Sequence, residues 1–275
     1  MPSISLPLVL SRATASTKRF PLVVGSALTA TIAAIVALQP GSHPLAERLV
    51  LAALLGLPLF TAATLTTEQW RISATGRIAA QAAGLLILAA WFLTARSEST
   101  ELSWTRFLHW SLAFHAAVAI LPYAGRGSTD TFWQYNRLLA TRFLLAAVYS
   151  TVLFLGLALA LGAIDQLLGI DVDSRMYPRL FFVLTFLVNP WYFLGGLPWD
   201  LRELEQVHDY PQGLRVFARY ILMPLVTIYL VILTLYLGKV LVTRTWPSGW
   251  IGYLVSGVSA AARMWRWAST SRDSA

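Results

Sequence analysis

The chain has 275 residues, of which 57% are hydrophobic and only 12% are charged, with a formal net charge of +8 and no cysteine. A soluble domain carries about a quarter charged residues, so this composition indicates an α-helical membrane protein with several spans. The absence of cysteine excludes disulfides, thiolate metal sites and cysteine nucleophiles. The basic residues lie singly between apolar runs rather than in a patch interleaved with aromatics, so we expect no nucleic-acid binding.

The N-terminal nineteen residues contain one short apolar stretch, from Leu6 to Leu10, followed by the basic residues Arg12, Lys18 and Arg19. A secretory signal peptide would need a longer apolar region after its positive residues. We therefore predict a cytoplasmic segment over residues 1–19 and expect the first span to act as an uncleaved anchor.

Eight apolar runs are close to the length of about 20 residues that a helix needs to cross a bilayer. No low-complexity linker divides them, so we predict an all-α, polytopic helical bundle that forms one domain over residues 20–267. A cytoplasmic tail is expected over residues 268–275. The spans are predicted near Phe20–Leu38, Leu49–Leu65, Ile78–Ala95, Trp104–Leu121, Arg142–Ile164, Tyr177–Leu197, Tyr220–Leu237 and Trp246–Trp267.

The distribution of basic residues predicts the orientation of these spans. With the N-terminus inside, cytoplasmic segments contain fourteen of the 21 Lys and Arg residues, and the opposite side contains seven. This excess has the sense that the positive-inside rule requires. Both termini are therefore expected in the cytoplasm of a multi-pass protein of the bacterial inner membrane.

The predicted sixth span contains an internal Asn189-Pro190 pair. Proline has no backbone N–H and its ring clashes with the carbonyl four residues earlier, here that of Phe186, so we expect a kink. Asn189 either joins this kink to a neighbouring helix or lines a polar cavity beside it. Pro224 is expected to kink the seventh span near the carbonyl of Tyr220 by the same mechanism.

The predicted fifth span belongs to a helix longer than a bilayer requires. With Thr131 as the N-cap, or Asp130 as an alternative, the pattern predicts a helix of about 33 residues that ends at Ile164, or roughly 50 Å, with a cytoplasmic extension. Residues 199–211 are predicted to form a short amphipathic helix on the same face of the membrane. A cytoplasmic interaction face is predicted from the polar and aromatic residues of both segments: Trp133, Tyr135, Asn136, Arg137, Glu205 and His208.

Small residues recur at a spacing of four within the same predicted helix. Gly156 is followed by Ala160, and Ala158 by Gly162. Residues four apart lie on one face of a helix, and small ones let the backbone of a second helix approach closely. The pattern predicts a close helix contact there.

Several short sequence motifs follow one another in the second half of the chain, in an order and spacing that resemble a known family. They resemble the bacterial integral-membrane family catalogued as domain of unknown function 4153, over about residues 132–257, whereas the first four spans match it only in hydropathy. The resemblance implies a multi-span membrane protein with no assigned activity, cofactor or substrate, and it supplies no catalytic residues. The motifs are Phe132-Trp-Gln-Tyr-Asn-Arg137, Leu155-Gly-Leu-Ala-Leu-Ala-Leu161, Asn189-Pro-Trp-Tyr-Phe-Leu194 with Pro198, Tyr210-Pro211, Pro224-Leu225 with Tyr229, and Trp246-Pro-Ser-Gly-Trp250.

The apolar cores of the eight predicted spans contain no Asp, Glu, Lys or Arg. Ion-coupled transporters need such groups within the membrane, so their absence argues against that class. His109 and His115 lie in the fourth span but differ by about 120° around a helix, which makes a shared metal or proton relay awkward. We interpret them as interfacial or helix-contact residues.

Two further groups of polar residues resemble metal sites only in part. Asp165, Asp171 and Asp173 could ligate a hard cation, but the loop lacks the other oxygens of a calcium site, so we interpret it as a solvated acidic loop. Glu205 and His208 have the spacing of a di-iron ligand pair, but such sites need two of these motifs in a bundle core. We therefore predict no catalytic residue, metal site or cofactor.

The sequence as a whole favours a non-enzymatic assembly, binding or sensory module in the membrane. Its expected partners are the lipid bilayer and either another membrane protein or a second copy of the chain. One alternative is a facilitator or lipid-handling permease that uses the kinked sixth and seventh helices. Another is a membrane-embedded enzyme, which would require the His208 region or the outer aspartates to be active.

Overall fold

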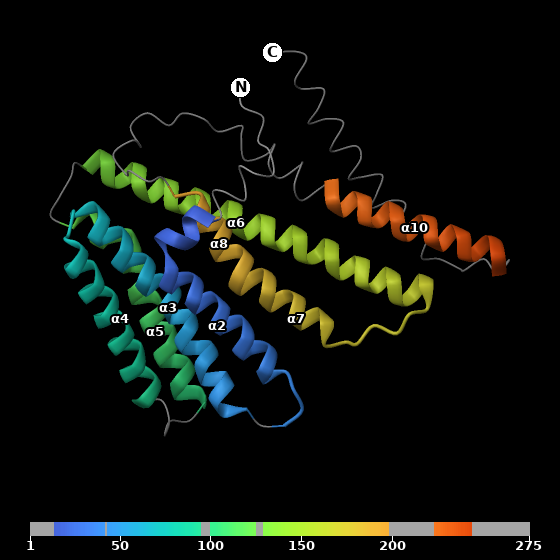
Figure 1. Cartoon of the computed structure of the whole chain (residues 1–275), viewed down its shortest axis with the longest axis horizontal. Helices are drawn as coiled ribbons and strands as arrows, with labels where there is room; N and C mark the ends of the chain where they lie inside the picture. Colours follow the sequence, from blue (N-terminus) through green and yellow to red (C-terminus); the bar gives the residue numbers. More distant parts are fainter. Residues whose placement is uncertain (1–13, 42, 95–99, 125–128, 198–222, 244–275) are drawn as a thin grey trace, which may run out of the picture. The chain divides into compact units, whose positions relative to one another are not determined.

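The computed structural model describes residues 14–41, 43–94, 100–124, 129–197 and 223–243, and throughout these ranges the regular structure is helical, with no strand (Figure 1). The expected all-helical fold is thus confirmed for this part of the chain. The predicted eighth span, near Trp246–Trp267, lies outside the described residues.

The first four long helices follow the apolar runs. They are α2 (Pro21–Ala37), α3 (Pro44–Gln69), α4 (Ala74–Thr94) and α5 (Thr100–Ile120), with the short 3₁₀ turn η2 (Leu121–Tyr123) after α5. Proline occupies the first position of both α2 and α3, where the missing N–H costs no helical hydrogen bond and the fixed φ suits the helix.

The fifth run forms one long helix. α6 (Thr129–Ala163) has 35 residues and continues into the π turn η3 (Ile164–Leu168). The predicted long helix is therefore confirmed, and it extends slightly further at its C-terminal end. Gly169 ends it in the left-handed conformation, with φ of 68°, which glycine adopts without a steric penalty.

The sixth run is helical throughout but changes its hydrogen-bond register. α7 (Met176–Phe182) passes into the π turn η4 (Val183–Val188), which is followed by α8 (Asn189–Gly195). The N–H of Asn189 donates to the carbonyl of Leu184, five residues earlier. A wider turn therefore lies directly before Pro190, where a regular α-helix would lose a hydrogen bond. The last described helix is α10 (Met223–Thr243).

Four helical segments in the described ranges are long and apolar enough to cross a membrane. The shorter α2 is also apolar. The chain is thus a helical protein of membrane type, while the full number of spans and the side on which the termini lie stay predictions. The four segments are Pro44–Gln69, Ala74–Thr94, Thr129–Leu168 and Met223–Val240.

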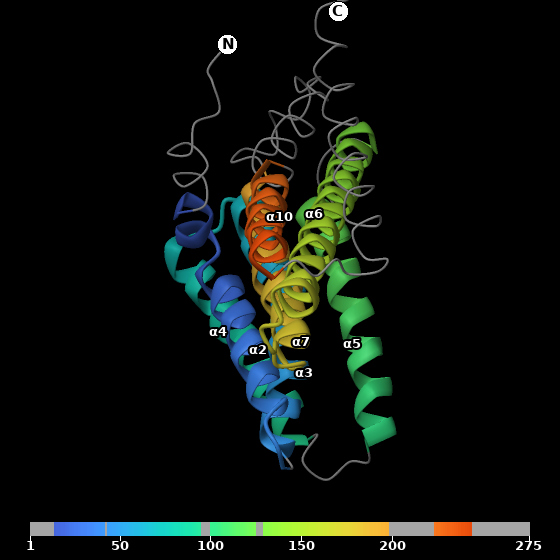
Figure 2. The ribbon, with the colours of Figure 1, turned by 90° about the vertical axis from the view of Figure 1, so that its right-hand side faces the viewer.

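The chain divides into two compact units, Met1–Ser150 with Pro178–His208, and Thr151–Tyr177 with Asp209–Ala275. In the first unit α3 is central and packs against α2, α4 and α5. Figure 2 shows α4 and α5 on either side of it. The core combines Phe20 and Val23 with Phe60, Leu65 and residues from α5, α6 and α8. The prediction of a single domain stays a prediction.

The second unit has its own apolar core, formed by the C-terminal half of α6 with η3 and by α10. Ala160, Ala163 and Leu167 pack there against Ile232 and Tyr236. A Cβ atom at Gly156 would lie 2.6 Å from side-chain carbons of Leu225. The predicted close contact along Gly156 and Ala160 is therefore confirmed, and its partner is α10.

This contact generates a stability prediction for Gly156→Ala. The added methyl group would overlap the buried side chain of Leu225, and such overpacking costs roughly 1–3 kcal/mol. The matched control is Gly238→Ala on α10, where no neighbouring atom lies within 4 Å of the new Cβ. Gain in helix propensity should stabilise that variant by about 0.5–1 kcal/mol.

Thermal unfolding of the two variants in mild detergent measures this difference. The unfolding midpoint should fall for Gly156→Ala and should be unchanged or higher for Gly238→Ala. Equal midpoints would show that the α6–α10 contact accommodates a larger residue at position 156 without strain.

Candidate functional site

A buried arginine marks one end of the first unit. Residues 14–19 form a short helix that ends at Arg19, because Pro21, at the first position of α2, cannot continue the preceding hydrogen-bond pattern. The side chain of Arg19 is only 4% exposed, and its guanidinium lies over the ring of the neighbouring Phe20, 4.9 Å from the ring centroid. A charge so far removed from water requires compensation.

Glu68, near the end of α3, supplies that compensation. Arg19 Nη2 donates to Glu68 Oε2 at 2.7 Å, and Nε lies 3.1 Å from both carboxylate oxygens. Arg19 Nη1 also donates to the backbone carbonyl of Leu197, just after α8, at 3.3 Å. The two donor groups facing Glu68 form the fork that guanidinium and carboxylate groups favour. One side chain thus joins three parts of the first unit that are far apart in sequence.

Neither member of this ion pair was identified from the sequence. Arg19 precedes the first predicted span and Glu68 follows the second, so both lie outside the apolar cores that were searched for charges. A usable signal was nevertheless present. Consecutive spans joined by a short loop run antiparallel, so the start of the first and the end of the second meet at the same face of the membrane.

A second set of contacts at this end satisfies the last carbonyls of α5. Trp70 Nε1 donates to the carbonyl of Pro122 at 3.2 Å, and the Tyr135 hydroxyl donates to that of Val118 at 2.8 Å. Asn136 Nδ2 donates to the carbonyl of Ala119 at 3.3 Å. Carbonyls at a helix C-terminus have no partner within the helix, so side chains from α3 and α6 take that role.

The predicted cytoplasmic interaction face is divided by these contacts. Tyr135 is completely buried, and Asn136 is half-buried between α5 and its own helix. Trp133, by contrast, is 68% exposed, and Arg137 is exposed beside it. The remaining members of that face, Glu205 and His208, lie outside the described residues. Trp133 and Arg137 are the described members of this face that are available to a partner.

Buried hydroxyl groups follow α3 towards Glu68. Thr61, Thr64 and Thr67 each donate to the carbonyl four residues earlier, at 2.7–2.8 Å. Gln81 from α4 donates to the hydroxyl oxygen of Thr64 at 2.9 Å. These side chains are engaged in helix contacts, so the arrangement stabilises the α3–α4 pair and provides no activated nucleophile.

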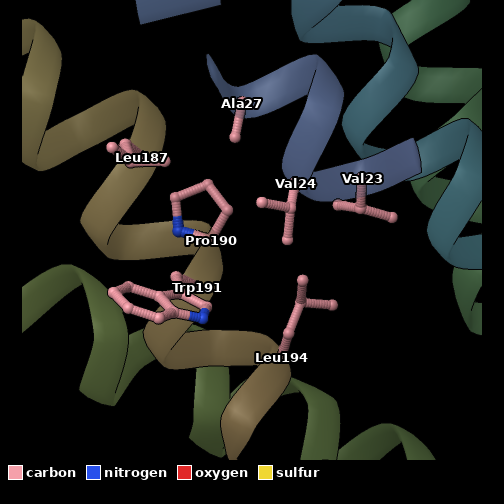
Figure 3. A pocket seen from close by; sticks show the side chains of 7 residues that line it. All are labelled: Val23, Val24, Ala27, Leu187, Pro190, Trp191 and Leu194. Atoms are coloured by element: carbon pink, nitrogen blue, oxygen red, sulfur yellow. The ribbon is translucent and has the colours of Figure 1, made fainter. Parts of the chain in front are cut away.

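The Asn189-Pro190 pair lies beside a small apolar pocket. Figure 3 shows Pro190 and Trp191 on one wall and side chains of α2, including Val24, on the other. The pocket has a volume of about 10 Å³, comparable to the space of one water molecule, and Asn189 is not among its lining residues. No hydrogen bond found in the described ranges involves the Asn189 side chain. Pro224 is the second residue of α10, and the predicted kink near Tyr220 lies outside those ranges.

The other candidate groups from the sequence stay separate. His109 Nδ1 and His115 Nδ1 each lie 2.7 Å from the carbonyl four residues earlier in α5, and both side chains are exposed. Asp165 accepts hydrogen bonds from Gln166 and from the backbone of Val172. In the residues that the structure describes, three or more His, Asp or Glu side chains do not gather in a way that could hold a metal ion.

Comparison with known proteins identifies one family. The model of a family described as "Domain of unknown function (DUF4153)" matches residues 20–264. The match therefore begins well before residue 132, where the recognised sequence motifs start. It includes helices α2 and α3, which the resemblance in the sequence had covered only in hydropathy. Neither the curated proteins nor the solved structures that were searched gave a match.

The Arg19–Glu68 pair yields a sharp stability prediction. Glu68→Gln would leave the buried guanidinium of Arg19 without its counter-charge, and breaking a buried pair in this way costs roughly 3–5 kcal/mol. The double change Arg19→Leu with Glu68→Leu removes both charges and should recover most of that loss. Glu47→Gln, at an exposed position in the first turn of the same helix, is the matched control and should leave stability nearly unchanged.

Thermal unfolding of the four proteins in detergent tests this account. The single Glu68 variant should have the lowest midpoint, and the double variant should lie close to the parent and the Glu47 variant. A double variant whose midpoint is as low as that of Glu68→Gln, or lower, would contradict coupling between the two charges.

Proposed function

The chain belongs to the DUF4153 family, whose description assigns no activity, and from this premise we propose that it is a non-enzymatic membrane module that binds a partner protein. The proposed binding site is the N-terminal part of α6. The observation that supports it is the exposure of Trp133 and Arg137 on a helix turn whose opposite side is held by Tyr135.

The geometry of this turn suits recognition. Residues 133 and 137 are four apart and therefore share one face of the helix, whereas residue 135 lies on the opposite face. The hydrogen bond from Tyr135 to Val118 and that from Asn136 to Ala119 fix the helix against α5. Tryptophan and arginine are the residue types most enriched at interaction hot spots, and a rigid support lowers the entropy lost on binding.

The charge of the chain favours an acidic partner. The net charge is +8, and we propose that fourteen of the 21 basic residues lie on the cytoplasmic side. A second copy would bring like charges together, whereas an acidic cytoplasmic segment of another membrane protein would be attracted to this surface. We therefore assign such a segment as the partner of Trp133 and Arg137.

This proposal includes an arrangement in the bacterial inner membrane with eight spans and both termini in the cytoplasm. It is supported by the excess of basic residues in the segments assigned to that side and by the exposed apolar side chains of α4 and α5, among them Leu86 and Leu112. Such side chains would face lipid. The end of the first unit with the Arg19–Glu68 pair would then face the cytoplasm.

The geometry gives less support to the alternatives. A facilitator or lipid-handling permease would use the kinked sixth and seventh helices, but the pocket beside Pro190 has room for about one water molecule. A membrane enzyme would need converging acid, base or nucleophilic groups. The buried hydroxyls and the Arg19–Glu68 pair described above are instead engaged in contacts between helices.

The absence of cysteine makes the topology easy to test. Single cysteines at Asp130, Asp171 and Glu205 should divide into two classes with a membrane-impermeant thiol reagent applied to intact cells. Position 171 should react from outside, whereas positions 130 and 205 should react only after the membrane is opened. External labelling at 130 or 205 would contradict the proposed topology.

The binding surface can be tested with a photo-reactive amino acid placed at position 140, beside Arg137 on α6. A cross-linked product should form with an acidic membrane protein, and its yield should fall as salt is raised because exposed charges are screened. Trp133→Ala with Arg137→Ala should lower the yield about tenfold or more, as expected for two hot-spot residues. The matched control is Leu144→Ala, which removes an exposed apolar side chain from the same helix.

Two outcomes would overturn the proposal. One is a yield that is equal in the double variant and in the Leu144→Ala control. The other is a cross-linked product consisting of two copies of this chain, which would identify self-association rather than binding of an acidic partner.

A further inference from the structure

Among the described residues of the first unit, Arg142 of α6 is a half-buried basic residue without a counter-charge. Its side chain is half-buried against the end of α8, and it has neither an ion pair nor a hydrogen bond with any residue that the structure describes. A guanidinium near or within a membrane is costly unless a counter-charge or hydrogen-bond acceptor accompanies it. The charge therefore indicates a binding function that the protein's own described groups do not fulfil.

A glycine makes the space that Arg142 occupies. A Cβ atom at Gly196 would lie 2.7 Å from Arg142 Cδ and 3.0 Å from its Nε. Any larger residue at 196 would thus displace the side chain. Arg142 is held over the last turn of α8 only because that position has no side chain.

Two tyrosines complete the surroundings of this arginine. Tyr149 of α6 and Tyr192 of α8 pack edge to face, with ring centroids 4.7 Å apart. Both hydroxyl groups lie close enough to Arg142 to interact electrostatically with its charge. Position 149 is two helical turns from 142, and position 192 is one turn from Gly196, so the four residues lie where α6 faces α8.

The neighbouring carboxylate is already engaged. Glu68 holds Arg19, which also donates to the carbonyl of Leu197, the residue after Gly196. Two guanidinium groups therefore approach the same end of α8, and the ion pair formed within the unit neutralises the first of them. In the described part of this unit no carboxylate pairs with Arg142, so we look for its ligand among anions from outside these residues.

We propose that Arg142, with Tyr149 and Tyr192, binds the phosphate of an anionic membrane lipid. The planar guanidinium matches two phosphate oxygens at once, and a tyrosine hydroxyl can donate to a third. Arg142 begins the predicted fifth span, at the depth of lipid headgroups. The adjacent Phe143 and Leu144 are 57% and 62% exposed and offer apolar surface to acyl chains. This site needs no partner protein and is thus independent of the proposed function.

Native mass spectrometry of the full chain, released from nanodiscs of phosphatidylglycerol and phosphatidylcholine, tests the proposal. The parent should retain phosphatidylglycerol preferentially. Arg142→Gln should weaken that binding about tenfold, because a charge-assisted hydrogen bond is lost. Gly196→Ala should weaken it too, since it displaces Arg142 without removing the charge. The matched control is Arg77→Gln, which removes an exposed basic residue from the same unit and should leave binding unchanged.

Inorganic phosphate distinguishes the source of the ligand. Millimolar phosphate should not displace the lipid, because it lacks acyl chains; displacement would show that the site takes free phosphate and would contradict the lipid assignment. If the parent protein retained phosphatidylglycerol and phosphatidylcholine equally, the proposal would be overturned. This comparison uses the unmodified protein, so it decides the question even if Arg142→Gln does not fold. Equal phosphatidylglycerol binding by Arg142→Gln and Arg77→Gln would overturn it as well.

Discussion

The ion pair between Arg19 and Glu68 is the constraint on which the first unit depends. The arginine side chain is almost completely buried, and it uses separate nitrogen atoms for the carboxylate of Glu68 and for the carbonyl of Leu197. A charge in such surroundings is tolerated only with its partners in place, because removing it from water costs several kcal/mol. The start of α2, the end of α3 and the end of α8 must therefore meet at one point. Within the unit, α4 and α5 pack against α3.

A shared problem explains the other polar contacts: the last backbone carbonyls of a helix have no hydrogen-bond partner within that helix. At the end of α5, side chains of Trp70 and Tyr135 donate to the free carbonyls. At the end of α6 in the second unit, Lys239 Nζ donates to the carbonyl of Leu167 at 2.9 Å. Before Pro190 the helix instead widens into a π turn. At each of these helix ends or breaks, a side-chain donor or a wider helical turn therefore satisfies the backbone hydrogen-bonding groups.

These contacts also bear on function, because they occupy the hydroxyl and carboxylate groups that an enzyme would use as nucleophile, acid or base. Buried threonines donate to their own helix, and Glu68 is fully engaged with Arg19. The described side chains that remain available for binding are aromatic and basic. Trp133 and Arg137 point outward from a fixed helix, and Arg142 lies half-buried beside two tyrosines. Aromatic and guanidinium groups held on rigid helices are suited to binding proteins or lipid phosphates, which is why recognition rather than catalysis is proposed.

Some of the candidate site could be anticipated from local sequence. Pro190 required an adjustment of the helix because it lacks an N–H, but the form of that adjustment, a π turn over Val183–Val188, is visible only in the structure. The exposure of Trp133 and the burial of Tyr135 follow once α5 lies against α6, since residues two apart face opposite ways. The four residues of α6 in the predicted face could not be divided into buried and exposed ones without knowing where that neighbouring helix lies.

The sequence by itself determined the helical, membrane-type character of the chain, the long α6 and the close contact at Gly156. Each follows from hydropathy, helix length or residue size, which act over a few turns of a single segment. Only the tertiary structure decided which charges meet. Arg19, Glu68 and Leu197 are separated by 49 and 178 positions along the chain, and Arg142 reaches Gly196 only because two helices pack together. Electrostatic and hydrogen-bond partners are chosen by proximity in space, and hydropathy along the chain carries little information about that proximity.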